Sequence, residues 1–198
     1  MIKLVIFDLL GVVLVYDRKA HIRQMCKILK KDERSILETM VPLWERMEVG
    51  ELNVADMKRI ASKRLGVTPW KLDRINNYDS VKINTKVIDI MRSLHKHYKV
   101  VILTNLSKGS YLIARRRFLD NKAYEKAFVS AYIRMKKPDY RAYELVMDRM
   151  NVTPEESLLI DDSPINVESA KKANMDAVLF VNQNQLMRSL LQKNIRIK

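Results

Sequence analysis

The first thirteen residues, Met1–Val13, read MIKLVIFDLLGVV, and they decide the fold. Leu4 to Phe7 form a short apolar run, which is typical of a strand buried on both faces. Asp8 follows at once, and Gly11 permits a sharp turn soon afterwards. Ligands bind at the carboxyl ends of the central strands in open parallel sheets. A carboxylate here therefore either starts a turn or serves a function, and the rest of the chain has to distinguish the two.

Leu14 to Tyr16 should form a short extended piece or flap, and from Asp17 to about Ser80 the sequence contains no good strand candidate. Apolar residues recur at helical spacing instead, for example Ile36, Met40 and Leu43. Asp32 and Asn53 are suited to begin helices, and Gly66 to end one. We predict an all-helical insertion with helices over residues 21–31, 34–48, 54–65 and 70–77.

From residue 85 onward, helical and apolar strand-like segments alternate. This alternation predicts an α/β fold, in which a Rossmann-like parallel sheet carries helices on both faces. The predicted helices cover residues 85–98, 108–119, 138–150, 164–173 and 183–192, and the predicted strands 99–103, 127–130, 157–160 and 177–181. We assign residues 1–15 and 82–198 to this core and residues 16–81 to the helical insertion.

Composition narrows the class of protein. The chain has 198 residues, 47% of them hydrophobic, enough for one domain with an insertion. A single cysteine, Cys26, excludes an internal disulfide framework and fits a reducing compartment. The chain shows neither a membrane-length apolar run nor a signal-peptide pattern, so we expect a cytoplasmic protein without membrane contact.

The net charge of +14 arises from 37 Lys+Arg against 23 Asp+Glu, and it favours anionic partners. The positive residues are spread along the chain and accompany no nucleic-acid-binding motif. We therefore disfavour nucleic acid as the partner and expect a small phosphorylated substrate, bound by a monomer or a homodimer.

Three predicted strands end in polar groups, and a fourth polar element precedes a helix. Asp8 follows the first strand, Thr104-Asn105 and Asp161-Asp162 follow two others, and Lys136-Lys137 precede Pro138. Parallel strands bring such ends to one edge of a sheet, so these groups should converge. Each pattern by itself is common in turns. Together they suit a carboxylate nucleophile or ligand, a lysine that balances its charge, and Mg²⁺, which binds few protein oxygens and keeps waters.

This constellation resembles the haloacid dehalogenase superfamily of aspartate-nucleophile hydrolases. The resemblance is carried by four stretches: FDLLGVV around Asp8, VVILTN ending at Thr104-Asn105, KKPD at Lys137, and LLIDDSPINVESAKKANM around Asp162. It covers about residues 1–15 and 84–182. It also implies that residues 16–81 form the small helical cap that this superfamily inserts after its first strand.

The resemblance implies that the chain is a hydrolase, and it gives the polar residues roles. Asp8 would attack phosphorus and form an aspartyl-phosphate. Thr104 and the Asn105 backbone would bind the transferring phosphoryl oxygens, and Lys137 would neutralise them and hold Asp8.

The same resemblance implies a Mg²⁺ site. Asp8, Asp161, Asp162 and the backbone carbonyl of Leu10 would hold the ion, which neutralises charge between two anions. Ser163 and Asn166 would orient these acids.

Leu10 departs from the superfamily pattern. Phosphatases of this superfamily have a second aspartate at this position, which protonates the leaving oxygen and then activates water. Three hypotheses remain open: a Mg²⁺-dependent phosphatase acting on a small phosphate ester, a catalytically impaired binding or regulatory protein, and a 2-haloacid dehalogenase-like carbon–halogen hydrolase. A proton donor from the cap would support the first hypothesis. The candidates are Asp17, His21, Glu45, Glu48 and Glu51.

Overall fold

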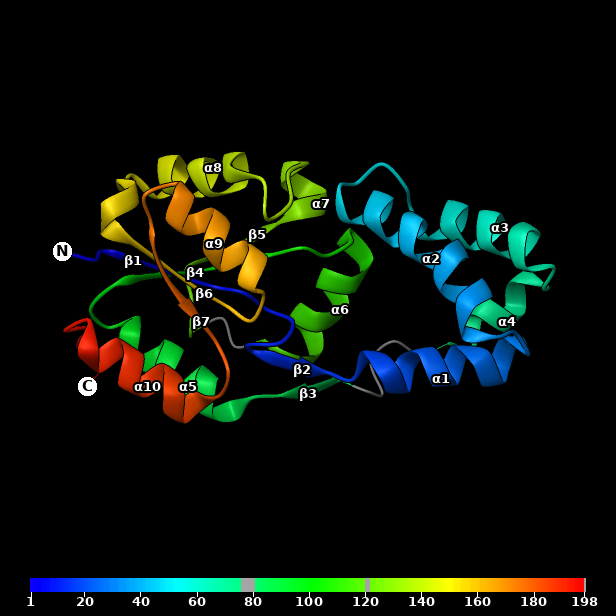
Figure 1. Ribbon diagram of the computed structural model, residues 1–198, viewed down its shortest axis with the longest axis horizontal. Coiled ribbons are helices and arrows are strands. Elements are labelled where there is room, and N and C mark those ends of the chain that lie inside the picture. Colours follow the sequence, from blue (N-terminus) through cyan, green and yellow to red (C-terminus); the bar gives the residue numbers. More distant parts are fainter. Residues whose placement is uncertain (76–80, 120–121, 198) are drawn as a thin grey trace.

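A parallel sheet with β1 at its centre organises the computed structural model, which describes residues 1–75, 81–119 and 122–197 (Figure 1). The strands are β1 (Leu4–Phe7), β4 (Lys99–Thr104), β5 (Lys126–Val129), β6 (Ser157–Asp161) and β7 (Asp176–Leu179). Their order is β5-β4-β1-β6-β7, and all neighbouring pairs run parallel. The predicted Rossmann-like parallel sheet is confirmed, and Asp8 follows its central strand.

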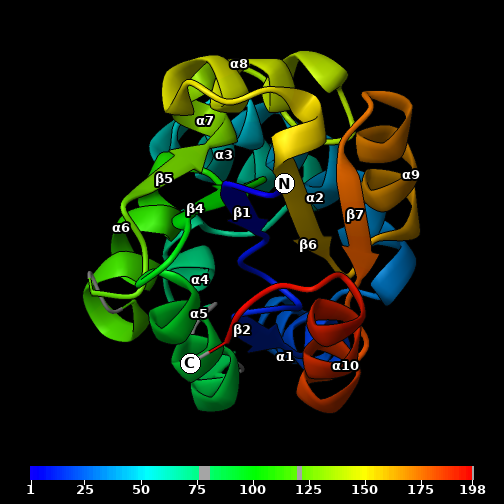
Figure 2. The ribbon, with the colours of Figure 1, turned by 90° about the vertical axis from the view of Figure 1, so that its left-hand side faces the viewer.

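Side chains alternate along each strand, so apolar residues point to both faces of the sheet. Helices cover both faces and bury these residues. Leu4 and Ile6 pack in one buried cluster, whereas Val5 and Phe7 pack in another. The first cluster is completed by α8 (Tyr140–Met150) and α9 (Pro164–Lys172), and the second mainly by α5 (Thr85–Leu94) and α10 (Gln183–Gln192). Figure 2 shows these two pairs on opposite sides of the sheet, with α6 (Lys108–Phe118) beside β5.

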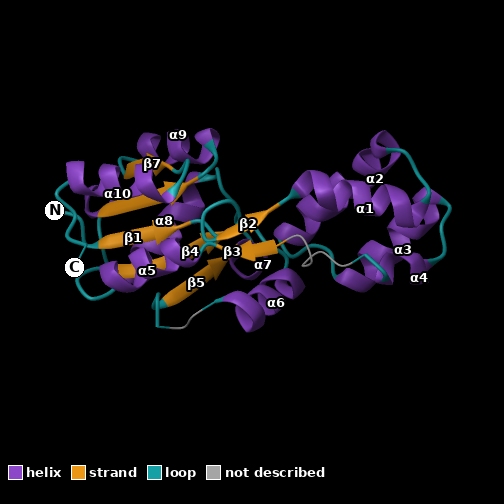
Figure 3. Ribbon diagram, turned by 90° about the horizontal axis from the view of Figure 1, so that it is seen from below, coloured by secondary structure: helices purple, strands orange, loops and turns teal. Residues whose placement is uncertain are grey.

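The predicted helical block consists of α1 (Arg18–Leu29), α2 (Glu33–Glu48), α3 (Val54–Leu65) and α4 (Pro69–Asp73). It has a buried cluster of its own, built on Ile36, Leu43 and their neighbours. Asp32 and Asn53 accept hydrogen bonds at the helix starts, and Gly66 ends α3 in the left-handed region. The block lies beyond the ends toward which the strands point (Figure 3). In the described ranges, no helix combines the length and apolar character required to cross a bilayer.

Several predicted boundaries differ from the structure. The helix expected from Pro138 begins at Tyr140 instead, because Asp139 is its N-cap. The helix expected to reach residue 98 ends at Leu94. Of the helix predicted over residues 70–77, the structure contains α4, and residues 76–77 lie outside the described ranges, as do 78–80, 120–121 and 198.

Three short elements were not predicted, one of them the 3-10 helix η1 (Pro154–Glu156). β3 (Val81–Ile83) pairs antiparallel with β2 (Leu14–Tyr16), and α7 (Ser130–Ile133) directly follows β5. Each is three or four residues long, too short to produce a periodic sequence pattern. The β2–β3 pair brings together the chain segments that enter and leave the helical block.

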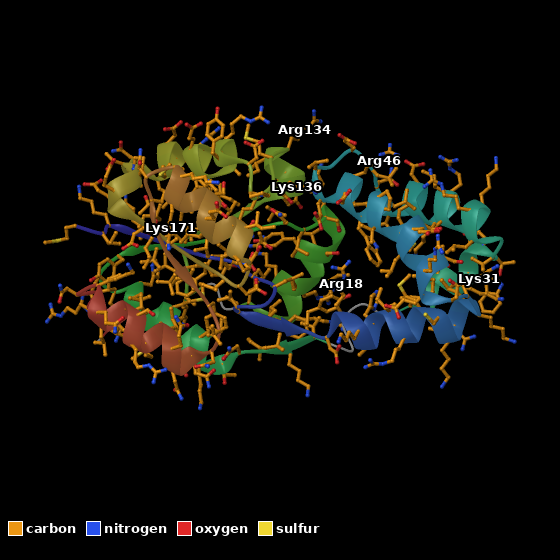
Figure 4. The ribbon with its side chains drawn as sticks, in the orientation of Figure 1. Arg18, Lys31, Arg46, Arg134, Lys136 and Lys171 are labelled. Carbon is orange, nitrogen blue, oxygen red and sulfur yellow. The ribbon has the colours of Figure 1, made fainter. Side chains whose placement is uncertain are left out.

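The helical block contacts the core through the end of α2. A Cβ atom added to Gly50 would lie 2.5 Å from the carbonyl oxygen of Ala131, so the backbones of these two segments touch. The Glu48 carboxylate lies 3.6 Å from the Lys136 ammonium across the same junction. Figure 4 shows Lys136 and Arg18 near this junction, whereas Lys31 and Lys171 lie far from it on opposite parts of the molecule.

His21 in α1 is a buried titratable residue at the base of the helical block. Only 3% of its surface is exposed, and its ring lies 5.8 Å from Tyr16 and 6.4 Å from Trp44, measured between ring centroids. Its Nδ1 atom has no hydrogen-bond partner among the described residues. Burial lowers the pKa of His21 from its ordinary value of 6.5, because the charged imidazolium is poorly solvated there.

We therefore expect His21 to make the protein less stable in acid. Below the pKa of the unfolded state, the unfolded chain binds a proton that the folded chain excludes, so stability falls as the pH drops. Urea unfolding at about pH 7.5 and about pH 5 should show a smaller loss of stability for His21→Phe than for the wild type. Equal losses in the two proteins would contradict this prediction.

Candidate active site

The ammonium group of Lys137 is buried between two carboxylates. Lys137 Nζ donates to Asp8 Oδ1 at 2.5 Å and to Asp161 Oδ2 at 2.6 Å. The strand register explains this convergence, since Phe7 pairs with Ile160 on the neighbouring strand and the acids follow immediately. The side chains of Lys137, Asp8 and Asp161 are 1%, 9% and 0% exposed. The structure thus brings together three predicted site residues from three distant segments.

This cluster contains more negative than positive charge. The pKa of Asp8 is raised to about 7 in total: burial raises it most, Lys137 opposes the rise, and the nearby Asp161 and Asp162 add to it. Burial alone would lower the pKa of Lys137, but attraction to Asp8 and Asp161 outweighs this, and its pKa is raised. Lys137 is therefore charged, and one lysine faces three carboxyl groups. Such a cluster favours an additional cation.

The two adjacent acids have different surroundings. Asp161 accepts hydrogen bonds from the Ser163 backbone at 2.9 Å and from the Asn166 amide at 3.0 and 3.1 Å, in addition to Lys137. Asp162 accepts no hydrogen bond from another described residue and lies against Gly11 instead. Asp161 is therefore saturated by donors, whereas the oxygens of Asp162 remain available to a ligand.

Gly11 is required by this arrangement. Its φ angle is +99°, a conformation that L side chains rarely adopt. A Cβ atom at this position would lie 2.0 Å from Oδ2 of Asp162. The sequence predicted only the turn, and the close approach to Asp162 is a tertiary feature.

The side chain of Asn105 holds the backbone of Lys137. Its amide donates to the Lys137 carbonyl at 2.8 Å, and its oxygen accepts from the Lys137 N–H at 3.0 Å. This leaves the backbone N–H of Asn105, rather than its side chain, for the predicted contact with a phosphoryl group. The neighbouring Thr104 is 1% exposed at the end of β4, and its hydroxyl makes no hydrogen bond with the described residues.

Sequence reasoning missed two supporting residues. The hydroxyl of Tyr143 donates to the Asn166 carbonyl at 3.1 Å, and Ser169 Oγ donates to the Pro138 carbonyl. Burial raises the pKa of Tyr143, so the hydroxyl keeps its proton for this bond. Both residues lie on predicted helices, and no sequence signal distinguished them from the other residues of those helices.

Leu10 packs at the edge of one buried cluster of the sheet. Its side chain cannot transfer a proton. Its carbonyl oxygen accepts no hydrogen bond from the described residues, which is compatible with a ligand role.

The five candidate proton donors of the helical block have different environments. Asp17 caps α1 through the Ala20 N–H at 2.8 Å, and Glu51 lies 3.6 Å from Arg46. His21 is enclosed by aromatic rings. Glu48 faces Lys136, and burial raises its pKa although Lys136 opposes the shift. The negative charge of Glu45 lies near Glu48 and contributes to the raised pKa of Glu48. Glu48 is thus paired with the residue that precedes Lys137.

Comparison with known proteins identifies the class. Residues 5–180 match the family of haloacid dehalogenase-like hydrolases, so the chain belongs to that family. It is 24% identical over 196 residues to drimenol cyclase drtB of Aspergillus calidoustus, with 96% of this chain aligned to 36% of that protein. The chain therefore spans about a third of the length of that relative.

Two further relatives are similar along most of their length. D-ribitol-5-phosphate phosphatase of Bacteroides thetaiotaomicron is 21% identical over 188 residues, with 89% of this chain and 90% of that protein aligned. A haloacid dehalogenase family enzyme of the same organism, solved with magnesium and inorganic phosphate, superposes with a TM-score of 0.78. It is 23% identical, with 90% of this chain and 93% of that chain covered. This likeness supports the fold described above.

We expect Gly11→Ala to destabilise the protein more than Gly66→Ala. Both glycines have positive φ, +99° and +61°, but no atom lies within 4 Å of a Cβ built on Gly66. Gly66→Ala should cost about 1–2 kcal/mol from backbone strain alone. Gly11→Ala should cost roughly 1–3 kcal/mol more, because Asp162 must move. Chemical denaturation measures both, and equal costs would show that the Asp162 contact does not matter.

Proposed function

We propose that this chain is a Mg²⁺-dependent phosphatase that hydrolyses a small phosphate ester through Asp8. The observation that carries the proposal is the buried pairing of Asp8 and Asp161 with Lys137 at one edge of the sheet. Lys137 engages Oδ1 of Asp8, which leaves Oδ2 for attack. A structural ion pair would not require an adjacent unpaired acid, Asp162, or an unpaired hydroxyl at Thr104.

The residues present fit a magnesium ion. The cluster has excess negative charge, and within the described ranges the oxygens of Asp162 accept no hydrogen bond from another residue and the Leu10 carbonyl accepts none. In the described ranges, no group of three or more His, Cys, Asp or Glu side chains could hold a metal by itself. Mg²⁺ tolerates such a sparse set because it keeps several waters. Asp8, Asp162 and the Leu10 carbonyl would hold the ion, with Asp161 behind them.

In the proposed reaction, Oδ2 of Asp8 bonds to phosphorus as the bond to the leaving oxygen breaks, and an aspartyl-phosphate forms. Thr104 and Lys137 bind the phosphoryl oxygens, and Mg²⁺ would neutralise charge between the two anions. A water then attacks phosphorus, and Asp8 and inorganic phosphate are released. Asn105 and Asn166 contribute before the reaction begins, because they hold Lys137 and Asp161 in position before substrate arrives.

Leu10 constrains the substrate. The leaving oxygen receives no proton from the side chain at this position, and loss of general acid–base catalysis typically costs about 10²–10⁴-fold in rate. Esters whose leaving group departs as a stable anion should therefore react best. Glu48 is the candidate of the helical block that we favour as an auxiliary proton donor, because it lies at the junction beside Lys136.

The relatives support the phosphatase hypothesis. One is named as a phosphatase of a sugar-alcohol phosphate, and the structurally similar enzyme was solved with magnesium and phosphate. We also infer that residues 16–81 act as a cap over the edge of a core formed by residues 1–15 and 82–198. A cytoplasmic location and a monomeric or homodimeric state remain predictions.

The proposal is tested by measuring phosphate release with Mg²⁺ from a panel of esters that includes an activated aryl phosphate. The wild type should hydrolyse the aryl ester, and Asp8→Asn should abolish this activity. Leu10→Asp should raise turnover on esters with poor leaving groups by on the order of 10²-fold or more, because it restores a proton donor.

The two alternative hypotheses predict different results in the same assay. A silent wild type with an active Leu10→Asp variant would indicate a binding or regulatory protein that retains the scaffold. Halide release from 2-haloacids without metal would indicate a dehalogenase. If all three proteins were silent on both substrate classes, the phosphatase proposal would be wrong.

We expect Asn105→Ala to lower kcat with little change in KM, because it removes both bonds that hold the Lys137 backbone. Small displacements of catalytic groups can cost about 10²-fold. Ser107→Ala is the control, since it removes the N-cap of α6 and leaves Lys137 untouched. If the two variants lose the same activity at equal stability, the positioning role of Asn105 is refuted.

A further inference from the structure

A cavity lined by three tyrosines, the tyrosine cavity, lies at the edge of the sheet and away from the aspartate cluster. Its volume is about 430 Å³, within the range of roughly 300–1,000 Å³ that small-molecule sites occupy. Figure 2 shows the two elements that form most of it, the outermost strand β5 and the adjacent helix α6. It is lined by Tyr111, Leu112, Arg115, Tyr124, Glu125, Lys126, Ala127 and Tyr132. None of the residues assigned to the candidate active site lines it.

Aromatic rings form much of the cavity wall. The rings of Tyr111 and Tyr132 meet edge to face, with centroids 6.3 Å apart. Tyr132 is 49% exposed, so part of its surface remains available to a ligand, while Lys108 lies 5.5 Å from its centroid. Exposed aromatic surface is suited to contact with a further planar ring, in an offset or edge-to-face arrangement.

Tyr111 adds a hydroxyl group to the residues of the wall. Tyr111 is 9% exposed, and its hydroxyl forms no hydrogen bond with the described residues. Because Tyr111 lines the cavity, its hydroxyl is a group with which a ligand could form a hydrogen bond.

The charges at the cavity favour an anion. Arg115 and Lys126 both line it and are exposed, and neither forms an ion pair with the described residues. Glu125 is the acidic residue among the lining side chains. Arginine and lysine are the side chains that bind phosphate and carboxylate groups, arginine with a bidentate geometry.

We propose that this cavity binds a small molecule in which an aromatic ring is joined to an anionic group, with a mononucleotide as the representative probe. The ring would contact Tyr132 and Tyr111, and the anion would bind Arg115 and Lys126. The cavity holds neither a pair of acids nor an activated nucleophile, so this is a binding site rather than a second catalytic site. The inference does not rest on the proposed phosphatase function.

The test is calorimetric titration of the full chain with adenosine 5′-monophosphate in metal-free buffer. Adenosine and inorganic phosphate, which each carry half of the ligand chemistry, serve as comparison ligands. We expect the monophosphate to bind at least about tenfold more tightly than either of them. Tyr132→Ala and the double variant Arg115→Ala, Lys126→Ala should each weaken binding about tenfold or more.

Arg116→Ala is the matched control, because Arg116 is an exposed neighbour on α6 that does not line the cavity. It should leave the affinity unchanged. Absence of binding at millimolar concentration, or binding that only Asp8→Asn or Lys137→Met weakens, would overturn the proposal. Much tighter binding of a single-stranded oligonucleotide through the same residues would overturn the assignment to a small molecule.

Discussion

The pairing of one buried ammonium with two buried carboxylates is the constraint on which the rest of the site depends. Removing one partner of such a cluster leaves an uncompensated buried charge, which typically costs about 3–5 kcal/mol. The surrounding residues keep Lys137 in place: Asn105 binds its backbone, and Asn166 and Ser163 hold Asp161. The β1 and β6 strands then fix Asp8 beside Asp161. The sheet thus serves to maintain an electrostatic arrangement that would be unfavourable in isolation.

In the reaction we propose, charge stabilisation and proton transfer are separated. The groups proposed to hold a phosphoryl group and a cation are all in place, whereas the side chain of Leu10 cannot transfer a proton. Under the proposed mechanism, the scaffold would support binding and nucleophilic attack, and the rate would depend on how easily the leaving group departs. Half-buried Glu48 provides a carboxylate at the junction, and its contact with Lys136 connects the helical block to the loop that carries Lys137.

Contacts between the helical block and the core use backbone as much as side chains. Gly50 lies against Ala131, and Gly109 of α6 lies close enough to Val54 that an added Cβ would touch its methyl group at 3.5 Å. The chain enters and leaves the block through the β2–β3 pair. Ala131 and Tyr132 are neighbours on α7, so the same short helix borders both the junction and the tyrosine cavity.

The sequence alone determined the parallel sheet, the helical block and the polar groups at the strand ends, because apolar periodicity and turn residues are local signals. It also identified Asp8, Lys137 and the Asp161-Asp162 pair, since strand ends of a parallel sheet converge. Only the tertiary structure distinguished saturated Asp161 from open Asp162, assigned the Asn105 side chain to the Lys137 backbone, and added Tyr143 and the tyrosine cavity. These features depend on which residues meet across distant segments, and neither spacing nor residue type records such contacts.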